Sequence, residues 1–98
     1  MAQRAAARIP AIRRVILFGS MVTGTPTPRS DADVLIEVDG SAHDHPRDRN
    51  PEMIRAMWPL VCPLDLFVYT TDELRQLTDA RSPVVSTALR DGVDLLQR

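Results

Sequence analysis

Two short apolar runs frame a Gly-Ser turn early in this chain, and this arrangement constrains the fold more than any other feature. Residues 14–18 read Arg-Val-Ile-Leu-Phe, Gly19-Ser20 follows directly, and a second run extends from Asp33 to Val38. Short apolar runs rich in β-branched residues and bounded by turn residues are typical of buried strands. We therefore predict two strands, 14–18 and 33–38, joined by a turn and a loop that contains two prolines.

The rest of the chain predicts helices around these strands. Asn50 and Ser82 are candidate N-caps, Thr71 precedes acidic residues at another helix start, and Gly92 is a stop signal. We predict helices over 2–8, 51–61, from 71 and over 83–90, a helical turn over 20–23, and strands over 63–69 and 93–97. This order indicates an α/β or α+β fold with a small mixed sheet of about four strands.

The length and charge of the chain limit the classes of function. With 98 residues and a net charge of −1, residues 1–98 are expected to form one domain without a broad basic surface for nucleic acid. No apolar stretch is long enough to span a membrane, and charged residues near the start argue against a signal peptide. We expect a cytoplasmic protein; its self-association is left open.

Three aspartates stand at the starts of predicted strands. Asp31 and Asp33 are two residues apart, so they project from one face with Cα atoms about 6.5–7 Å apart. Asp65 lies near the start of the third strand and would reach the same sheet edge if the two strands were parallel neighbours. Carboxylates brought together there would repel one another unless a divalent cation neutralised them or they were partly protonated. Magnesium prefers such oxygen ligands and shares its shell with substrate phosphates, so this trio predicts a magnesium site.

The turn at Gly19-Ser20 supplies a candidate phosphate site. Gly19 would allow close approach of the backbone, Ser20 adds a hydroxyl donor, and the following helical turn offers free N–H groups. Gly24 would let the chain leave that turn tightly. Each signal is common by itself: a Gly-Ser turn, a pair of solvated charges or an N-cap would explain it. In this order, the signals favour a site for a nucleoside triphosphate.

These residues resemble the minimal nucleotidyltransferases of the DNA polymerase beta superfamily. The resemblance is carried by Gly19-Ser20-x-x-x-Gly24, then Ser30-Asp31-x-Asp33, and then Asp65 on a later strand. It implies a mixed sheet flanked by helices, two magnesium ions, and a nucleoside triphosphate such as ATP as substrate. It assigns Asp31, Asp33 and Asp65 as metal ligands and catalytic residues. The nucleotide-binding residues that it suggests are Gly19, Ser20, Gly24 and Ser30.

The same resemblance suggests a partner. Small stand-alone members of this family are commonly antitoxins encoded beside a helical HEPN-type ribonuclease toxin, and some transfer AMP from ATP to a tyrosine of that toxin. This chain lacks a recognisable acceptor-binding domain, which favours a protein acceptor. It departs from the family at Met21 and Thr23, where arginines are common. The alternative is therefore a non-catalytic antitoxin, or a nucleotide-binding module, that neutralises its partner by direct binding.

Four other features have structural interpretations. We expect Trp58 to anchor its helix to the sheet, with stacking on an adenine as the alternative, and Met53 and Met57 to fill the core or an interface. His43-Asp44-His45 lacks further ligands at usable spacing and is interpreted as a solvated loop. We expect solvated side chains for Arg13, Arg14, Arg47, Arg49 and Arg55, with contact to an acidic partner as the alternative for a few of them.

Overall fold

The computed structural model describes residues 2–19, 32–40, 46–58 and 64–96, and its centre is a four-stranded mixed sheet. The strands are β1 (Ile12–Phe18), β2 (Ala32–Val38), β3 (Leu64–Thr70) and β4 (Val93–Asp94), in the spatial order β3-β2-β1-β4. β1 runs antiparallel to β2 and β4, whereas β2 and β3 are parallel. The predicted mixed sheet of about four strands is confirmed.

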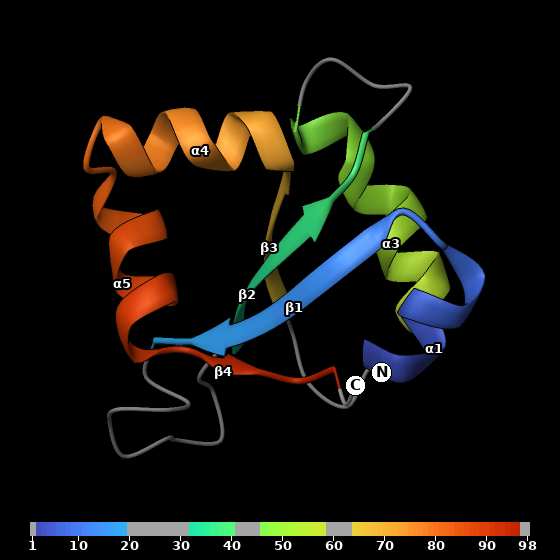
Figure 1. Cartoon of the computed structure of the whole chain (residues 1–98). Coiled ribbons are helices and arrows are strands. Elements are labelled where there is room, and N and C mark those ends of the chain that lie inside the picture. The colour runs from blue at the N-terminus through green and yellow to red at the C-terminus, as the bar shows by residue number, and fades with distance from the viewer. Residues whose placement is uncertain (1, 20–31, 41–45, 59–63, 97–98) are drawn as a thin grey trace.

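Helices cover both faces of this sheet. They are α1 (Ala2–Arg8), the 3-10 helix η1 (Pro46–Arg49), α3 (Asn50–Met57), α4 (Thr71–Asp79) and α5 (Pro83–Asp91). Figure 1 shows α1 and α3 on one side of the sheet, and α4 and α5 joined in an L shape on the other. This is a three-layer arrangement in which each face of the sheet is buried against a helix pair.

Alternation along β2 divides the core into two clusters. Val34, Ile36 and Val38 lie in the cluster beneath α1 and α3, together with the buried Met53 and Met57. Leu35 points the other way, into the cluster formed with α4 and α5. The period of two residues in a strand therefore fixes which side chains share the opposite face with Asp33 and Glu37.

The third helix is shorter than the sequence predicts, and its cap differs. Arg49 occupies the N-cap position and Asn50 is already helical, so Asn50 is not the cap. The helix ends at Met57, because Trp58 is extended, with φ −62° and ψ 140°. Trp58 precedes Pro59, and a residue before proline is disfavoured in the helical region. Trp58 is 61% exposed, so its predicted role as an anchor to the sheet is wrong.

The elements after β3 follow the sequence signals more closely. Thr70 caps α4 in a reciprocal capping box with Glu73, so the helix begins at Thr71 as predicted. Ser82 occupies the N-cap of α5, although its side chain makes no capping hydrogen bond, and Gly92 ends that helix. β4 covers only Val93–Asp94 rather than 93–97. The predicted turn over 20–23 and the loop with His43, Asp44 and His45 lie outside the described residues.

Arg49 is buried, contrary to the prediction that it is solvated. Its side chain is 4% exposed and forms an ion pair with Glu73, with 2.5 Å between Nη1 and Oε1. Nη1 also donates to the carbonyl oxygen of Val68 at 3.1 Å. This arginine therefore ties η1 to β3 and to the start of α4. Within the described part of the chain, no helix is both long and apolar enough to cross a bilayer.

Candidate active site

Two of the three predicted aspartates stand directly opposite each other at one edge of the sheet. In the parallel pairing of β2 with β3, Asp33 is the register partner of Asp65. Neighbouring strands lie about 4.8 Å apart, and register partners project from the same face of a sheet. The condition that the sequence left open, a parallel pairing that brings Asp65 beside Asp33, is therefore met.

Gly19 comes next to this pair because β1 ends there. Phe18, the last residue of β1, is the register partner of Asp33 in the antiparallel pairing of β1 with β2. Gly19 then turns with φ +82°, a left-handed conformation in which side chains are strained. A Cβ at this position would overlap Oδ2 of Asp33 and lie 3.2 Å from its Cγ. Gly19 therefore leaves the room that the Asp33 carboxylate occupies.

Aromatic side chains form the base of this edge. The rings of Phe18 and Phe67 have centroids 5.8 Å apart and are tilted by 48°. Phe18 is 5% exposed and belongs, with Leu35, to the core cluster under α4 and α5. Asp65 is exposed, and Asp33 is half-buried. Register and alternation put the two carboxylates on the same face of the sheet as these rings.

The other predicted site residues cannot be placed. Ser20, Gly24, Ser30 and Asp31 lie outside the described residues, as do Met21 and Thr23 of the family's arginine positions. In the described ranges, no group of three or more histidine, cysteine or acidic side chains could hold a metal ion. The described part of the predicted site therefore consists of Gly19, Asp33 and Asp65.

The side chains of the described site residues are of the chemical type that binds a magnesium ion. Two carboxylates as direct neighbours are unfavourable without a counter-charge, because like charges opposite each other in a sheet destabilise it. They offer up to four hard oxygen donors, the ligand type that magnesium prefers. Asp33 and Asp65 are the described residues that would hold the ion.

Sequence reasoning missed two parts of this arrangement. It assigned Gly19 only to the approach of a phosphate, whereas the structure shows that Gly19 also accommodates the carboxylate of Asp33. It gave no role to Phe18 and Phe67, whose ring contact crosses the face of β2. The position of Phe67, two residues after Asp65, was the signal that both share one face of β3.

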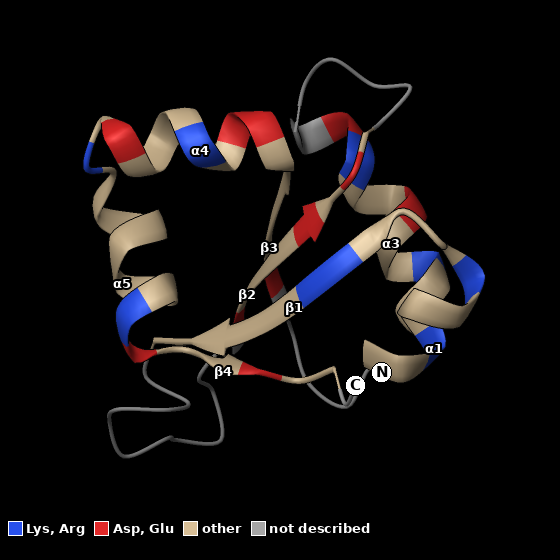
Figure 2. Cartoon of the chain, viewed as in Figure 1, with Lys and Arg blue, Asp and Glu red and all other residues tan. Residues whose placement is uncertain are grey.

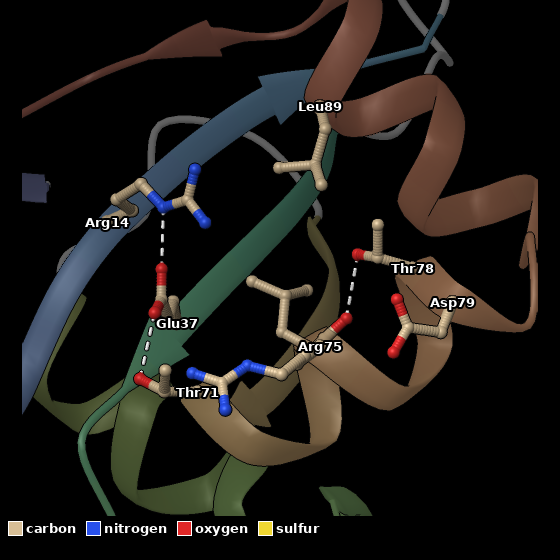
Figure 3. Close-up of a pocket in the computed structure, with 8 residues that line it drawn as sticks. Arg14, Glu37, Thr71, Arg75, Thr78, Asp79 and Leu89 are labelled. Carbon is tan, nitrogen blue, oxygen red and sulfur yellow. Dashed lines mark hydrogen bonds and ion pairs between the residues drawn. The ribbon is translucent and has the colours of Figure 1, made fainter.

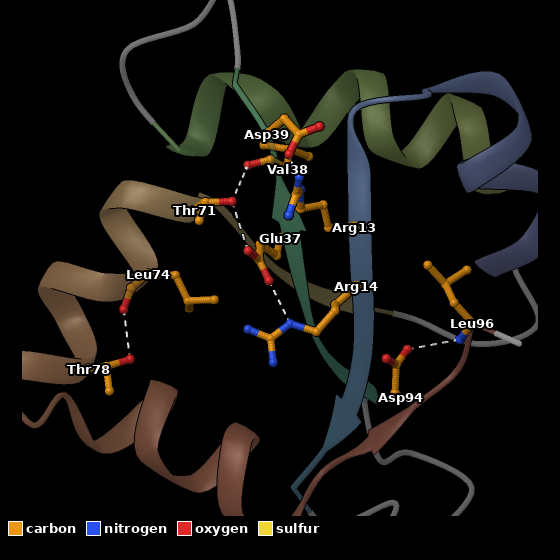
Figure 4. A network of polar contacts seen from close by, with 10 residues as sticks. All are labelled: Arg13, Arg14, Glu37, Val38, Asp39, Thr71, Leu74, Thr78, Asp94 and Leu96. Carbon is orange, nitrogen blue, oxygen red and sulfur yellow. Dashed lines mark hydrogen bonds and ion pairs between the residues drawn. The ribbon is translucent and has the colours of Figure 1, made fainter. Parts of the chain in front are cut away.

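A second polar cluster lies at the other end of the same sheet face (Figure 4). Glu37 is 6% exposed and accepts hydrogen bonds from Nε of Arg14 at 2.6 Å and from the Thr71 hydroxyl at 2.8 Å. Nearby, Arg13 pairs with Asp39 at the surface. Arg14 is therefore only partly solvated, and Glu37 is a buried, paired carboxylate outside the predicted site.

The fold is that of a nucleotidyltransferase domain. Residues 2–86 match the model of the nucleotidyltransferase domain family, and the chain belongs to that family. A crystal structure at 1.40 Å resolution of a proposed nucleotidyltransferase from Sulfolobus solfataricus has a similar fold, with a TM-score of 0.64 and 22% sequence identity. The similarity covers 99% of this chain and 74% of that one. No curated protein is significantly similar in sequence.

Proposed function

We propose that this chain is a magnesium-dependent enzyme that transfers AMP from ATP to a tyrosine hydroxyl of a partner HEPN toxin and thereby acts as its antitoxin. In this proposal residues 1–98 work as a single catalytic domain. Asp31, Asp33 and Asp65 hold the metal, and Gly19, Ser20, Gly24 and Ser30 bind the nucleotide. The supporting observation is the direct register of Asp33 with Asp65 beside the left-handed turn at Gly19.

The reaction assigns one task to each part of this edge. The acceptor oxygen attacks the α-phosphorus of ATP, the bond to the β-phosphate oxygen breaks, and pyrophosphate leaves. Bound magnesium would polarise the phosphate oxygens and neutralise the charge that develops on them. Asp65 is exposed, so an acceptor hydroxyl can reach it, and its carboxylate takes the proton that this hydroxyl loses. The backbone at Gly19 lies next to Asp33 and binds the triphosphate close to the carboxylates.

Transfer of label from ATP tests this proposal. The chain is incubated with magnesium, ATP labelled in the α-phosphate and the protein encoded by the adjacent gene, and modified tyrosine is identified by mass spectrometry. Asp33→Asn should reduce transfer by about 1,000-fold, because several kcal/mol of transition-state stabilisation are lost at about 1.4 kcal/mol per tenfold. Asp94→Asn, a carboxylate change on β4, is the matched control and should leave transfer unchanged. Full transfer by the Asp31→Asn, Asp33→Asn double variant would exclude this mechanism.

Met21 and Thr23 favour a second candidate, a non-catalytic antitoxin. They replace cations that would lie beside a triphosphate, so they reduce the expected affinity for ATP. A non-catalytic antitoxin requires the Asp31→Asn, Asp33→Asn variant to restore growth fully in cells that express the toxin, and to form a stable complex with it. Loss of rescue with the complex intact would reject this candidate.

A further inference from the structure

A cleft of about 230 Å³ lies at the opposite end of the sheet face from Asp33 and Asp65 (Figure 3). Glu37, in its wall, is four residues along β2 from Asp33, which corresponds to about 13 Å. The cleft lies in the corner between β1, β2, α4 and α5. The lining residues used below are Arg14, Glu37, Thr71, Leu74, Arg75, Asp79 and Leu89.

Glu37 has a fixed role in this cleft. Both of its carboxylate oxygens accept hydrogen bonds, Oε1 from Nε of Arg14 and Oε2 from the Thr71 hydroxyl. Its side chain is 8% exposed, so these contacts are shielded from water, and the charge of Glu37 is balanced by Arg14. The hydrogen bond from Nε to Glu37 also sets the orientation of the Arg14 guanidinium.

That orientation directs hydrogen-bond donors into the cleft. Arg14 uses Nε for Glu37, and Figures 3 and 4 show its two terminal nitrogens pointing away from Glu37, into the space before α4. These nitrogens make no hydrogen bond with any residue that the structure describes. Arg75 brings a second guanidinium from α4, exposed and likewise without a described partner. Figure 2 shows the corresponding basic segments on β1 and α4.

We propose that this cleft binds the carboxylate or phosphate group of a small molecule, at a site separate from that of nucleotidyl transfer. A planar guanidinium with two free terminal nitrogens matches an oxyanion with two parallel hydrogen bonds. Leu74 and Leu89 offer apolar contact for the rest of the ligand. The volume is below that of sites for drug-sized molecules, which suits a ligand of few atoms.

Asp79 makes the sign of the ligand's charge testable. It lies one helical turn after Arg75 and is the lining carboxylate that no described residue pairs with. An anion in the cleft is attracted by Arg14 and Arg75 and repelled by Asp79 and by Glu37, whose charge Arg14 balances. Removal of either arginine and removal of Asp79 should therefore change the affinity in opposite directions, whereas a cationic ligand would reverse both signs.

Titrations followed by amide NMR test the proposal on the full chain without magnesium. Inorganic phosphate and malonate are the two probes, and they distinguish a phosphate from a carboxylate ligand. Saturable shifts are expected at Thr71, Leu74 and Leu89. Arg75→Gln should weaken binding about tenfold, as for one lost charge-assisted hydrogen bond, and Asp79→Asn should tighten it. Arg14→Lys keeps the charge beside Glu37 but removes the fork, so it should weaken binding as well.

Arg55→Gln is the control, because Arg55 is also an exposed arginine but belongs to α3, on the opposite side of the sheet. It should leave the affinity unchanged. The proposal is overturned if neither probe gives saturable shifts, if the shifts centre on Gly19, if Arg55→Gln weakens binding as much as Arg75→Gln, or if Asp79→Asn weakens it.

Discussion

At the scale of single residues, Gly19 connects the fold to the chemistry. The sequence analysis explains this glycine by the close approach of a phosphate to the backbone. The structure adds a second reason, since the left-handed turn and the absence of a Cβ leave space for the Asp33 carboxylate. A substitution at Gly19 should therefore affect the position of Asp33, the proposed metal ligand, as well as the proposed phosphate contact.

Gly19→Ala should cause a large loss of transfer activity and a modest loss of stability. The left-handed conformation costs about 1–2 kcal/mol with a side chain, and the new methyl group would displace Asp33. We expect at least about a 100-fold loss of activity, since a misplacement of about 1 Å can cost that much. Gly40→Ala is the matched control, because a Cβ at Gly40 meets nothing within 4 Å. Equal activity of the two variants would contradict this assignment.

Asp65→Asn should stabilise the protein when magnesium is absent. It removes one of two like charges that face each other across neighbouring strands, a change worth up to about 1 kcal/mol. The same variant should lose most of the rise in Tm that magnesium gives the unmodified chain, because binding to the folded state is weakened. Thermal unfolding with and without magnesium checks both signs. A lower Tm for the variant without metal would show that the two charges do not repel.

At the scale of elements, the sequence predicts where the strands lie better than it predicts which strands pair with each other. Because side chains alternate along a strand, Val34 and Leu35 of the predicted strand 33–38 lie on opposite faces, and the structure places them in different core clusters. Alternation could not specify that β3 pairs with β2 in parallel, because that choice depends on how α3 returns the chain. The burial of Arg49 was missed for a related reason: its partners Val68 and Glu73 are distant in sequence.

The ion pair of Arg49 with Glu73 should make stability sensitive to acid. The hydrogen bond from Arg49 is the main cause that lowers the pKa of Glu73 below its ordinary value of 4.5. Folding is then favoured by this group above the unfolded pKa, and the contribution is lost as the pH falls through the folded pKa. The stability of the unmodified chain should therefore drop below about pH 4.5 more steeply than that of Glu73→Gln. Parallel curves from urea unfolding at pH 3–7 would contradict this.

Arg49→Met provides the second test of this ion pair. It keeps an apolar stem in the buried position but removes the donors to Val68 and Glu73, which should cost about 2–3 kcal/mol at pH 7. Arg13→Met is the control, since Arg13 pairs with Asp39 at the surface. A surface pair is worth at most about 1 kcal/mol, so the two variants should separate clearly in urea unfolding.

At the scale of the whole molecule, the fold class was predictable because it depends on local signals. Apolar runs, the Gly-Ser turn and the spacing of acidic residues all act within a few positions. The ends of elements were less predictable where tertiary contacts decide: Trp58 leaves its helix before Pro59 and stays exposed. The cleft at Arg14 and Arg75 was not predicted at all, because it is formed by four elements.

The most direct test of the whole account is to locate a bound divalent cation. Manganese, a paramagnetic substitute for magnesium, is added at low ratio to the labelled chain, and the loss of amide NMR signals is mapped. We expect the strongest losses at Gly19, Asp33 and Asp65, and their disappearance in the Asp33→Asn, Asp65→Asn variant. Losses centred elsewhere, or unchanged by that variant, would show that these two carboxylates do not form the metal site.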